Sequence, residues 1–169
     1  MAESVMARDP TGSPLQPSLL DRLLVSGPKD RPISGSRKAL SARKLRECVL
    51  RDVTWLLNTT NLATRVDFQQ FPEIARSVVN FGMPALTGNL RAALERDAVA
   101  SQIAQCIATF EPRLTQVKVT PEVSSTAEIF TVAFRIEAEL WGDPVPQHLT
   151  LRTAIDVGTG ECLLEDRGG

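Results

Sequence analysis

The chain has 169 residues, of which 43% are hydrophobic, and this length suits one domain with a single core. Its 19 lysines and arginines nearly balance 20 aspartates and glutamates, so a net charge of -1 does not favour a nucleic-acid binder. No stretch reaches the roughly 18 to 20 consecutive apolar residues of a membrane-spanning helix, and the amino-terminal residues do not resemble a signal peptide, so we expect a cytoplasmic protein without a membrane span.

Residues 1–36 are expected to form a flexible, basic arm, where the excess of basic charge is counted over the chain up to Lys44, with eight basic and four acidic residues. They hold five of the eleven prolines and three of the ten glycines, which disfavour a continuous helix or strand. Within the arm, residues 18–25 form a short apolar segment whose leucines are Leu19, Leu20, Leu23 and Leu24. A helix this short is unstable alone because its nucleation cost is not recovered. The leucines must therefore dock, either on the body of this chain or on a partner.

Three helices are predicted in the middle of the chain. Apolar residues recur at intervals of three and four over residues 37–57, which is typical of an amphipathic helix. A short second helix is expected over residues 72–79, because Pro72 has a backbone angle that suits the first helical turn. A third is expected over residues 89–110, ending before Pro112.

Beyond the third helix the hydrophobic pattern alternates with a period of two, which is typical of β-strands. The alternating segments cover residues 114–119, 129–140, 147–157 and 162–164. Helices followed by strands favour an α+β fold in which about three helices pack on one face of an antiparallel sheet of three to four strands. We expect residues 37–165 to form this single domain and residues 166–169 to be a tail.

The sequence contains no motif of a metal, cofactor or catalytic triad site. Cys48, Cys106 and Cys162 form no CxxC pair or Cys/His cluster, so neither a disulfide framework nor a structural zinc site is indicated. The only histidine, His148, has no nucleophile motif near it, and no phosphate-binding loop is present. We therefore expect no cofactor and no metal.

The most informative local feature is the sequence Glu111-Pro112-Arg113, where the third helix meets the first strand. A carboxylate at the carboxyl end of a helix is disfavoured by the helix dipole, so Glu111 requires a cationic partner. One interpretation is a local capping ion pair with Arg113. The other is that the bend at Pro112 displays the acid and the base for recognition by another protein.

Four segments together carry a resemblance to a known family. They are Pro17–Leu23, Leu56–Thr59, Asn80–Pro84 and, above all, Phe110–Leu114. In this order and spacing they resemble TssE, the baseplate subunit of bacterial type VI secretion systems, which is similar to the small wedge protein of contractile phage tails. The resemblance runs from about residue 17 to residue 164. The sequence departs from the family in the residues before Pro17 and at Thr59-Thr60-Asn61, where relatives often carry a basic residue.

The resemblance implies a structural, non-enzymatic role in a wedge-like domain. Members of the family join the baseplate wedge to the contractile sheath and help to start sheath assembly. The resemblance implies that Glu111, Pro112 and Arg113 dock on TssF and TssG, with TssK nearby, and that a sheet edge pairs with the sheath proteins TssB and TssC. An unpaired edge of an antiparallel sheet is chemically suited to such pairing.

An alternative interpretation is a lysozyme-like glycoside hydrolase acting on peptidoglycan, because phage relatives were labelled as lysozymes. It would make Glu111 the general acid, with a second carboxylate from Asp143, Glu137 or Glu139. Such a pair must lie roughly 5 to 9.5 Å apart. The spacing of these residues in the sequence gives no support for this arrangement.

Overall fold

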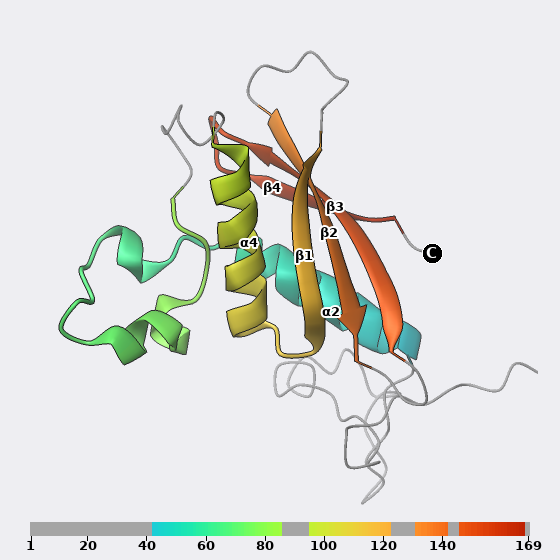
Figure 1. The fold of residues 1–169 in the computed structure, drawn as a ribbon, viewed down its shortest axis with the longest axis horizontal. Coiled ribbons are helices and arrows are strands. Elements are labelled where there is room, and N and C mark those ends of the chain that lie inside the picture. Colours follow the sequence, from blue (N-terminus) through green and yellow to red (C-terminus); the bar gives the residue numbers. More distant parts are fainter. Residues whose placement is uncertain (1–41, 86–94, 123–130, 142–145, 168–169) are drawn as a thin grey trace, which may run out of the picture.

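The structure is a computed structural model that describes residues 42–85, 95–122, 131–141 and 146–167. It has two layers, with α-helices on one face of a four-stranded antiparallel sheet (Figure 1). The elements in chain order are α2 (Ala42–Leu57), the 3₁₀ turns η1 (Leu62–Thr64), η2 (Pro72–Arg76) and η3 (Val78–Asn80), α4 (Arg96–Phe110), β1 (Leu114–Glu122), β2 (Thr131–Leu140), β3 (Gln147–Asp156) and β4 (Cys162–Asp166). The predicted α+β class and antiparallel sheet are confirmed.

The sheet is a meander in which each strand pairs with the next along the chain, in the order β1-β2-β3-β4. In this register Val132 lies opposite Ile155, and Ile155 lies opposite Cys162 on the other side. The register of β1 shifts between Thr115 and Lys118, which is a β-bulge. All four predicted strands are therefore present.

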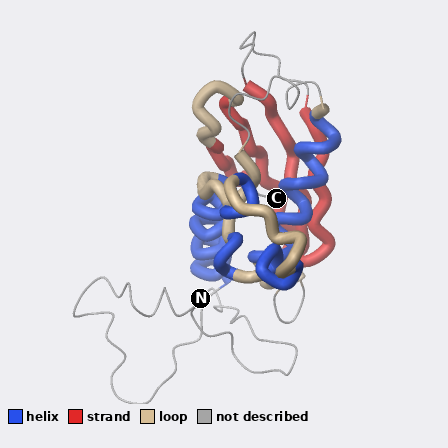
Figure 2. The backbone as a smooth tube through the Cα atoms, turned by 90° about the vertical axis from the view of Figure 1, so that its left-hand side faces the viewer, coloured by secondary structure: helices blue, strands red, loops and turns tan. Residues whose placement is uncertain are grey.

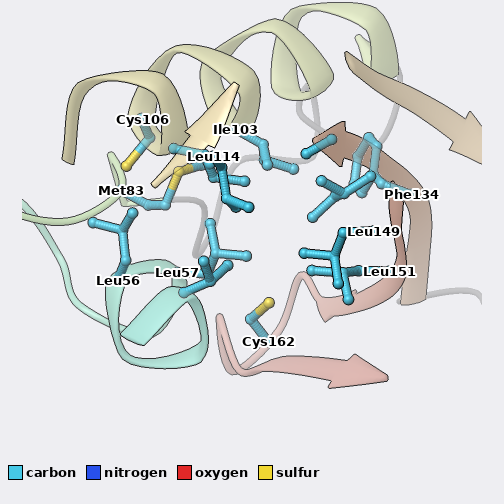
Figure 3. Packing of buried hydrophobic residues seen from close by; sticks show 14 of the residues in the cluster. Leu56, Leu57, Met83, Ile103, Cys106, Leu114, Phe134, Leu149, Leu151 and Cys162 are labelled. Atoms are coloured by element: carbon cyan, nitrogen blue, oxygen red, sulfur yellow. The ribbon is translucent and has the colours of Figure 1, made fainter. Parts of the chain in front are cut away.

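Period-two alternation places one face of the sheet against the helices. Phe134, Ile136 and Leu151 point to this face and are fully buried, at 0% exposed. They pack against α2 and α4 residues such as Val53 and Ile103 in one continuous cluster (Figure 3). Figure 2 shows both helices on the same side of the strands, so this cluster is the core between the two layers. Burial of such side chains contributes roughly 1.5 to 3 kcal/mol each.

The prediction of three α-helices is wrong in its second member. In place of a helix over residues 72–79, the structure has two 3₁₀ turns separated by Ser77, whose backbone is extended at φ -89° and ψ 163°. The physical reason is that Val78 and Val79 are 84% and 62% exposed, so no apolar face is buried to stabilise a short helix. Residues 89–94 of the predicted third helix lie outside the described residues. In the described part, α4 begins at Arg96, since Glu95 has non-helical backbone angles.

The chain between α2 and α4 forms a separate lobe, residues 61–82, which protrudes from the body in Figure 1. Its two ends are held together by an isolated bridge between Thr60 and Met83. Thr59 O accepts a hydrogen bond from Met83 N (2.7 Å) beside Gly82, whose φ is +119°. A Cβ atom on Gly82 would lie 2.3 Å from that same oxygen, so the close approach requires glycine.

Candidate functional site

Glu111 is the C-cap of α4, and its carboxylate is paired inside the protein. Its side chain is 5% exposed, and Arg113 binds both of its oxygens. Arg113 Nε donates to Oε1 at 2.6 Å, Nη2 donates to Oε2, and the backbone N–H of Arg113 also donates to Oε1 at 3.2 Å. The bend at Pro112 makes this return contact possible over two residues. The structure therefore brings the predicted acid and base together as a local ion pair.

Asp52 on α2 is a third member of this group, which we call the ion cluster (Asp52, Glu111 and Arg113). Arg113 Nη2 donates to Asp52 Oδ2 at 2.6 Å, and Asp52 Oδ1 accepts from Arg51 at 2.6 Å. The sequence analysis missed Asp52 because it lies 61 residues from Arg113 and has no motif around it. Its only sequence signal is its place between apolar positions of an amphipathic helix.

The ion cluster fixes the charge of Arg113 and joins three elements. Burial alone would lower the pKa of Arg113, but its hydrogen bonds to Glu111 and Asp52 outweigh burial and raise that pKa above its ordinary value. The backbone O of Arg113 also accepts from Trp141 N at 3.0 Å, at the end of β2. Arg113 thus holds α2 and the end of α4 through its guanidinium, and the end of β2 through its backbone carbonyl.

Only part of the predicted motif is open to solvent. Pro112 is exposed, the Arg113 side chain is 24% exposed, and the Glu111 carboxylate faces inward. A carboxylate bound at both oxygens and shielded from solvent is not placed to protonate a substrate. Pro112 and the outer part of Arg113 are therefore the parts of this motif that reach the surface.

A ladder of aromatic rings lies next to the ion cluster in the sequence. Phe110 precedes Glu111, and its ring contacts Phe81 edge-on at 5.4 Å between centroids. Phe81 in turn contacts Trp55 at 6.2 Å, and Trp55 lies one helical turn after Asp52. Trp55 is 57% exposed. Aromatic residues with one free side are common anchors in protein interfaces.

The lobe carries further exposed apolar side chains. Phe71, Val78 and Val79 are 61%, 84% and 62% exposed, and Val66 is 44% exposed. A shallow hollow of about 620 Å³ between Ala63 and Ala75 opens on the same lobe. Large apolar side chains concentrated on one segment usually mark a surface that another chain covers. The lobe is therefore the second part of the candidate site.

The remaining predicted residues do not join this site in the structure. Ile136 and Ala138 of β2 face the helices, so Glu137 and Glu139 point to the opposite face of the sheet. Asp143 and the arm leucines Leu19, Leu20, Leu23 and Leu24 lie outside the described residues. Within the described ranges, no group of histidine, cysteine, aspartate and glutamate could hold a metal ion, and no helix is long and apolar enough to cross a bilayer.

A comparison with protein families matches residues 43–145 to the family of baseplate wedge protein gp25. The matched segment is more than half of the 169-residue chain. This chain belongs to the baseplate wedge family. The family indicated by the sequence motifs is thereby confirmed. No curated protein and no solved structure matches the chain significantly.

The match to the wedge family contains the whole ion cluster and the lobe, and it ends before β3. The family is one of structural baseplate proteins, which act by assembling with other baseplate components. For this wedge protein the useful question is therefore which surfaces are open to neighbours. Besides the lobe, these include the two edges of the sheet.

The two edges of the wedge protein differ in what they offer another strand. In an antiparallel edge strand, every second residue points its backbone N–H and C=O away from the sheet. Asp156 N donates to Glu161 O at 2.9 Å, which identifies the residues of β4 that bond inward. The backbone groups of Cys162 and Leu164 therefore point outward from the edge.

The edge of β1 is less suited to pairing. Gln116 lies in its bulge with a φ of 52°, and Pro121 has no N–H to donate. Bulges and prolines are the features by which edge strands resist added strands. Of the two edges, β4 offers the more regular backbone to a partner.

Proposed function

We propose that this chain is a structural subunit of a type VI secretion system baseplate, that it joins the baseplate wedge to the contractile sheath, and that it helps to start sheath assembly in the cytoplasm. Membership of the wedge family supports the baseplate role. The TssE-like motifs, above all Glu111-Pro112-Arg113, support the choice of secretion system. A role without catalysis is part of this proposal.

The proposed contact with the sheath is supported by the open backbone groups at the edge of β4. The N–H and C=O of Leu164 point away from β3, and no contact with either group is seen among the described residues. A partner strand could use both groups, as in β-strand addition. We propose that a strand of the sheath proteins TssB and TssC pairs there.

The contact with the baseplate wedge is proposed for the other open surface. Pro112 and the outer part of Arg113 follow Phe110 of the aromatic ladder in the chain, and the lobe adds the exposed side chains of Val78 and Val79. We propose that TssF and TssG cover this surface, with TssK nearby. In this proposal Glu111 positions Arg113 and does not touch the partner. The arm leucines Leu19, Leu20, Leu23 and Leu24 are proposed to bind a partner as well.

The edge contact is tested by replacing Leu164 with proline. Leu164→Pro removes the outward N–H, while the pairing of β4 with β3 does not use that group. We expect the variant to fold and to lose co-purification with TssB and TssC. Leu164→Val is the matched control, because it shortens the same half-buried side chain and keeps the N–H. Equal recovery of TssB and TssC with both variants would contradict the edge contact.

The wedge contact is tested by a charge on the lobe. Val78→Asp places a carboxylate at a side chain that is 84% exposed, so folding should be unaffected. We expect loss of TssF and TssG from co-purification and retention of TssB and TssC. Leu164→Pro should show the reverse pattern, so each variant is the control for the other. Retention of TssF and TssG by Val78→Asp would count against the lobe as their docking surface.

A further inference from the structure

The side chain of Asn58 binds the backbone of β4. Asn58 directly follows the last residue of α2, and 104 residues separate it from Cys162. Its Nδ2 donates to Cys162 O at 2.9 Å, and its Oδ1 accepts from Cys162 N at 2.9 Å. Nδ2 also donates to Thr54 O at 2.9 Å, which holds the carboxamide in this orientation.

These two bonds use the backbone N–H and C=O of Cys162, which point away from β3 at the free edge of the sheet. Cys162 lies opposite Ile155 at a position whose backbone groups point outward, since the inward bonds of β4 begin with Glu161. The Asn58 carboxamide supplies one acceptor and one donor there, as a residue of a neighbouring strand would. Asn58 therefore completes the ladder at Cys162 in place of a fifth strand.

A second contact keeps this arrangement in register. Arg46, near the start of α2, binds the carboxylate of Asp166 with Nε to Oδ2 at 2.7 Å and Nη2 to Oδ1 at 2.6 Å. Helix α2 is thus attached to both ends of β4, through Asn58 at Cys162 and through Arg46 at Asp166. The carboxamide is held at the edge before any partner arrives.

We propose that Asn58 is an edge plug, which excludes a partner strand from Cys162 and makes strand addition begin at Leu164. The proposal rests on the sheath pairing proposed above for β4. A plug of this kind sets the register of the added strand, because a one-residue slip would reverse its side chains. Asn58 is thus a specificity-determining residue for the partner strand.

The test is residue-resolved amide hydrogen exchange on the full chain, free and bound to purified TssB–TssC heterodimer. In the free protein Asn58→Ala should speed exchange of the Cys162 amide about five- to tenfold, as expected for loss of one hydrogen bond, and leave Leu164 unchanged. Thr59→Ala is the matched control. It removes a bond from Thr59 Oγ1 to Trp55 O (2.8 Å) at the same helix end and does not touch β4.

With the sheath heterodimer bound, the wild type should gain protection at Leu164 while the Asn58 side-chain amide resonance stays in place. In Asn58→Ala the new protection should extend to Cys162. Displacement of Asn58 in the wild type, or identical protection in the two proteins, would overturn the plug and leave the sheath pairing intact. No new protection anywhere in residues 162–166 would overturn the sheath pairing itself, and the plug with it.

Discussion

The two-layer body and the lobe of this wedge protein keep their shapes by different means. The body buries a continuous cluster from both helices and all four strands. The turns η1 and η2 of the lobe contain no buried residue. Instead, Asn80 Oδ1 accepts from Ala63 N at 2.8 Å and its Nδ2 donates to Ala75 O at 2.9 Å, while Asn61 caps η1.

This difference shows how one chain can provide both rigidity and a binding surface. Side-chain amides that bond the backbone hold the lobe in shape without using its apolar side chains. Phe71, Val78 and Val79 consequently remain outside. In the described part of the body most large apolar side chains lie in the core, and the exposed ones are Trp55 and Leu163, at 57% and 63%. The body therefore offers partners its edges, its polar face and these two side chains. The following predictions test this division, from the largest expected effect to the smallest.

Truncation of the core and of the lobe should have opposite consequences. Phe134→Ala removes a ring that is 0% exposed and leaves a cavity in the core, so we expect the free energy of unfolding to fall by about 3 to 5 kcal/mol. Phe71→Ala removes a ring that is 61% exposed and should change stability by less than about 0.5 kcal/mol. Urea denaturation of both variants measures the difference. Similar losses would show that the lobe is packed as tightly as the body.

Removal of the guanidinium should disconnect α2 from the turn between α4 and β1. Arg113→Ala leaves the Glu111 carboxylate shielded and without its counter-ion, so we expect a loss of about 2 to 4 kcal/mol, below that for a fully buried pair because Arg113 is 24% exposed. Arg43→Ala is the matched control, since its bridge to Glu47 is on the surface and is worth less than about 1 kcal/mol. Equal midpoints in thermal melts of the two variants would contradict the role of the ion cluster.

The neck of the lobe, where Thr60 and Met83 form their bridge, can be weakened at one residue. Gly82→Ala would force a side chain at φ +119° against Thr59 O, so we expect a loss of about 1 to 3 kcal/mol concentrated at the neck. Gly158→Ala is the milder comparison, because that glycine has no positive φ and its Cβ would meet only a side-chain oxygen of Asp156, at 3.1 Å, so we expect a smaller loss than for Gly82→Ala.

Thiol labelling can locate this effect. Cys106 Sγ contacts Gly82 O at 3.3 Å, and burial raises the pKa of Cys106 to about 12, so it should react at pH 8 only when the neck opens. Gly82→Ala should therefore speed labelling of Cys106 more than that of Cys162, which is buried in the sheet. Equal acceleration at both cysteines would show that the lobe and the body open together.

The polar face of the sheet should contribute least. The hydrogen bond from Arg135, with help from Arg152, lowers the pKa of Glu122 in the folded protein. The stability from this group is therefore present at neutral pH and is lost as the pH falls through the folded pKa. Glu122→Gln should reduce stability at pH 7 by less than about 1 kcal/mol, and this difference should vanish in acid. A difference that grows on acidification would contradict this sign.

The same division explains which parts of the fold could be predicted. Helix α2 and the strands follow from periodic patterns, because a local repeat of apolar residues is what a helix or a strand buries. The segment after Pro72 has a helix start and helix-forming residues, yet it forms 3₁₀ turns. Whether this segment becomes an α-helix depends on whether Val78 and Val79 pack against another part of the protein. The local sequence pattern does not carry that information.

By itself, the sequence determined the α+β class, the strand faces and the family, since each depends on patterns of residues near one another in the chain. It offered the contact of Glu111 with Arg113 as one of two interpretations, and the structure decided between them. Only the tertiary structure decided that Asp52 joins this pair and that Asn58 covers Cys162, because packing brings together groups 61 and 104 residues apart. It also decided the direction in which each group points. Burial turns the Glu111 carboxylate inward, and the alternation of β4 turns the backbone of Leu164 outward.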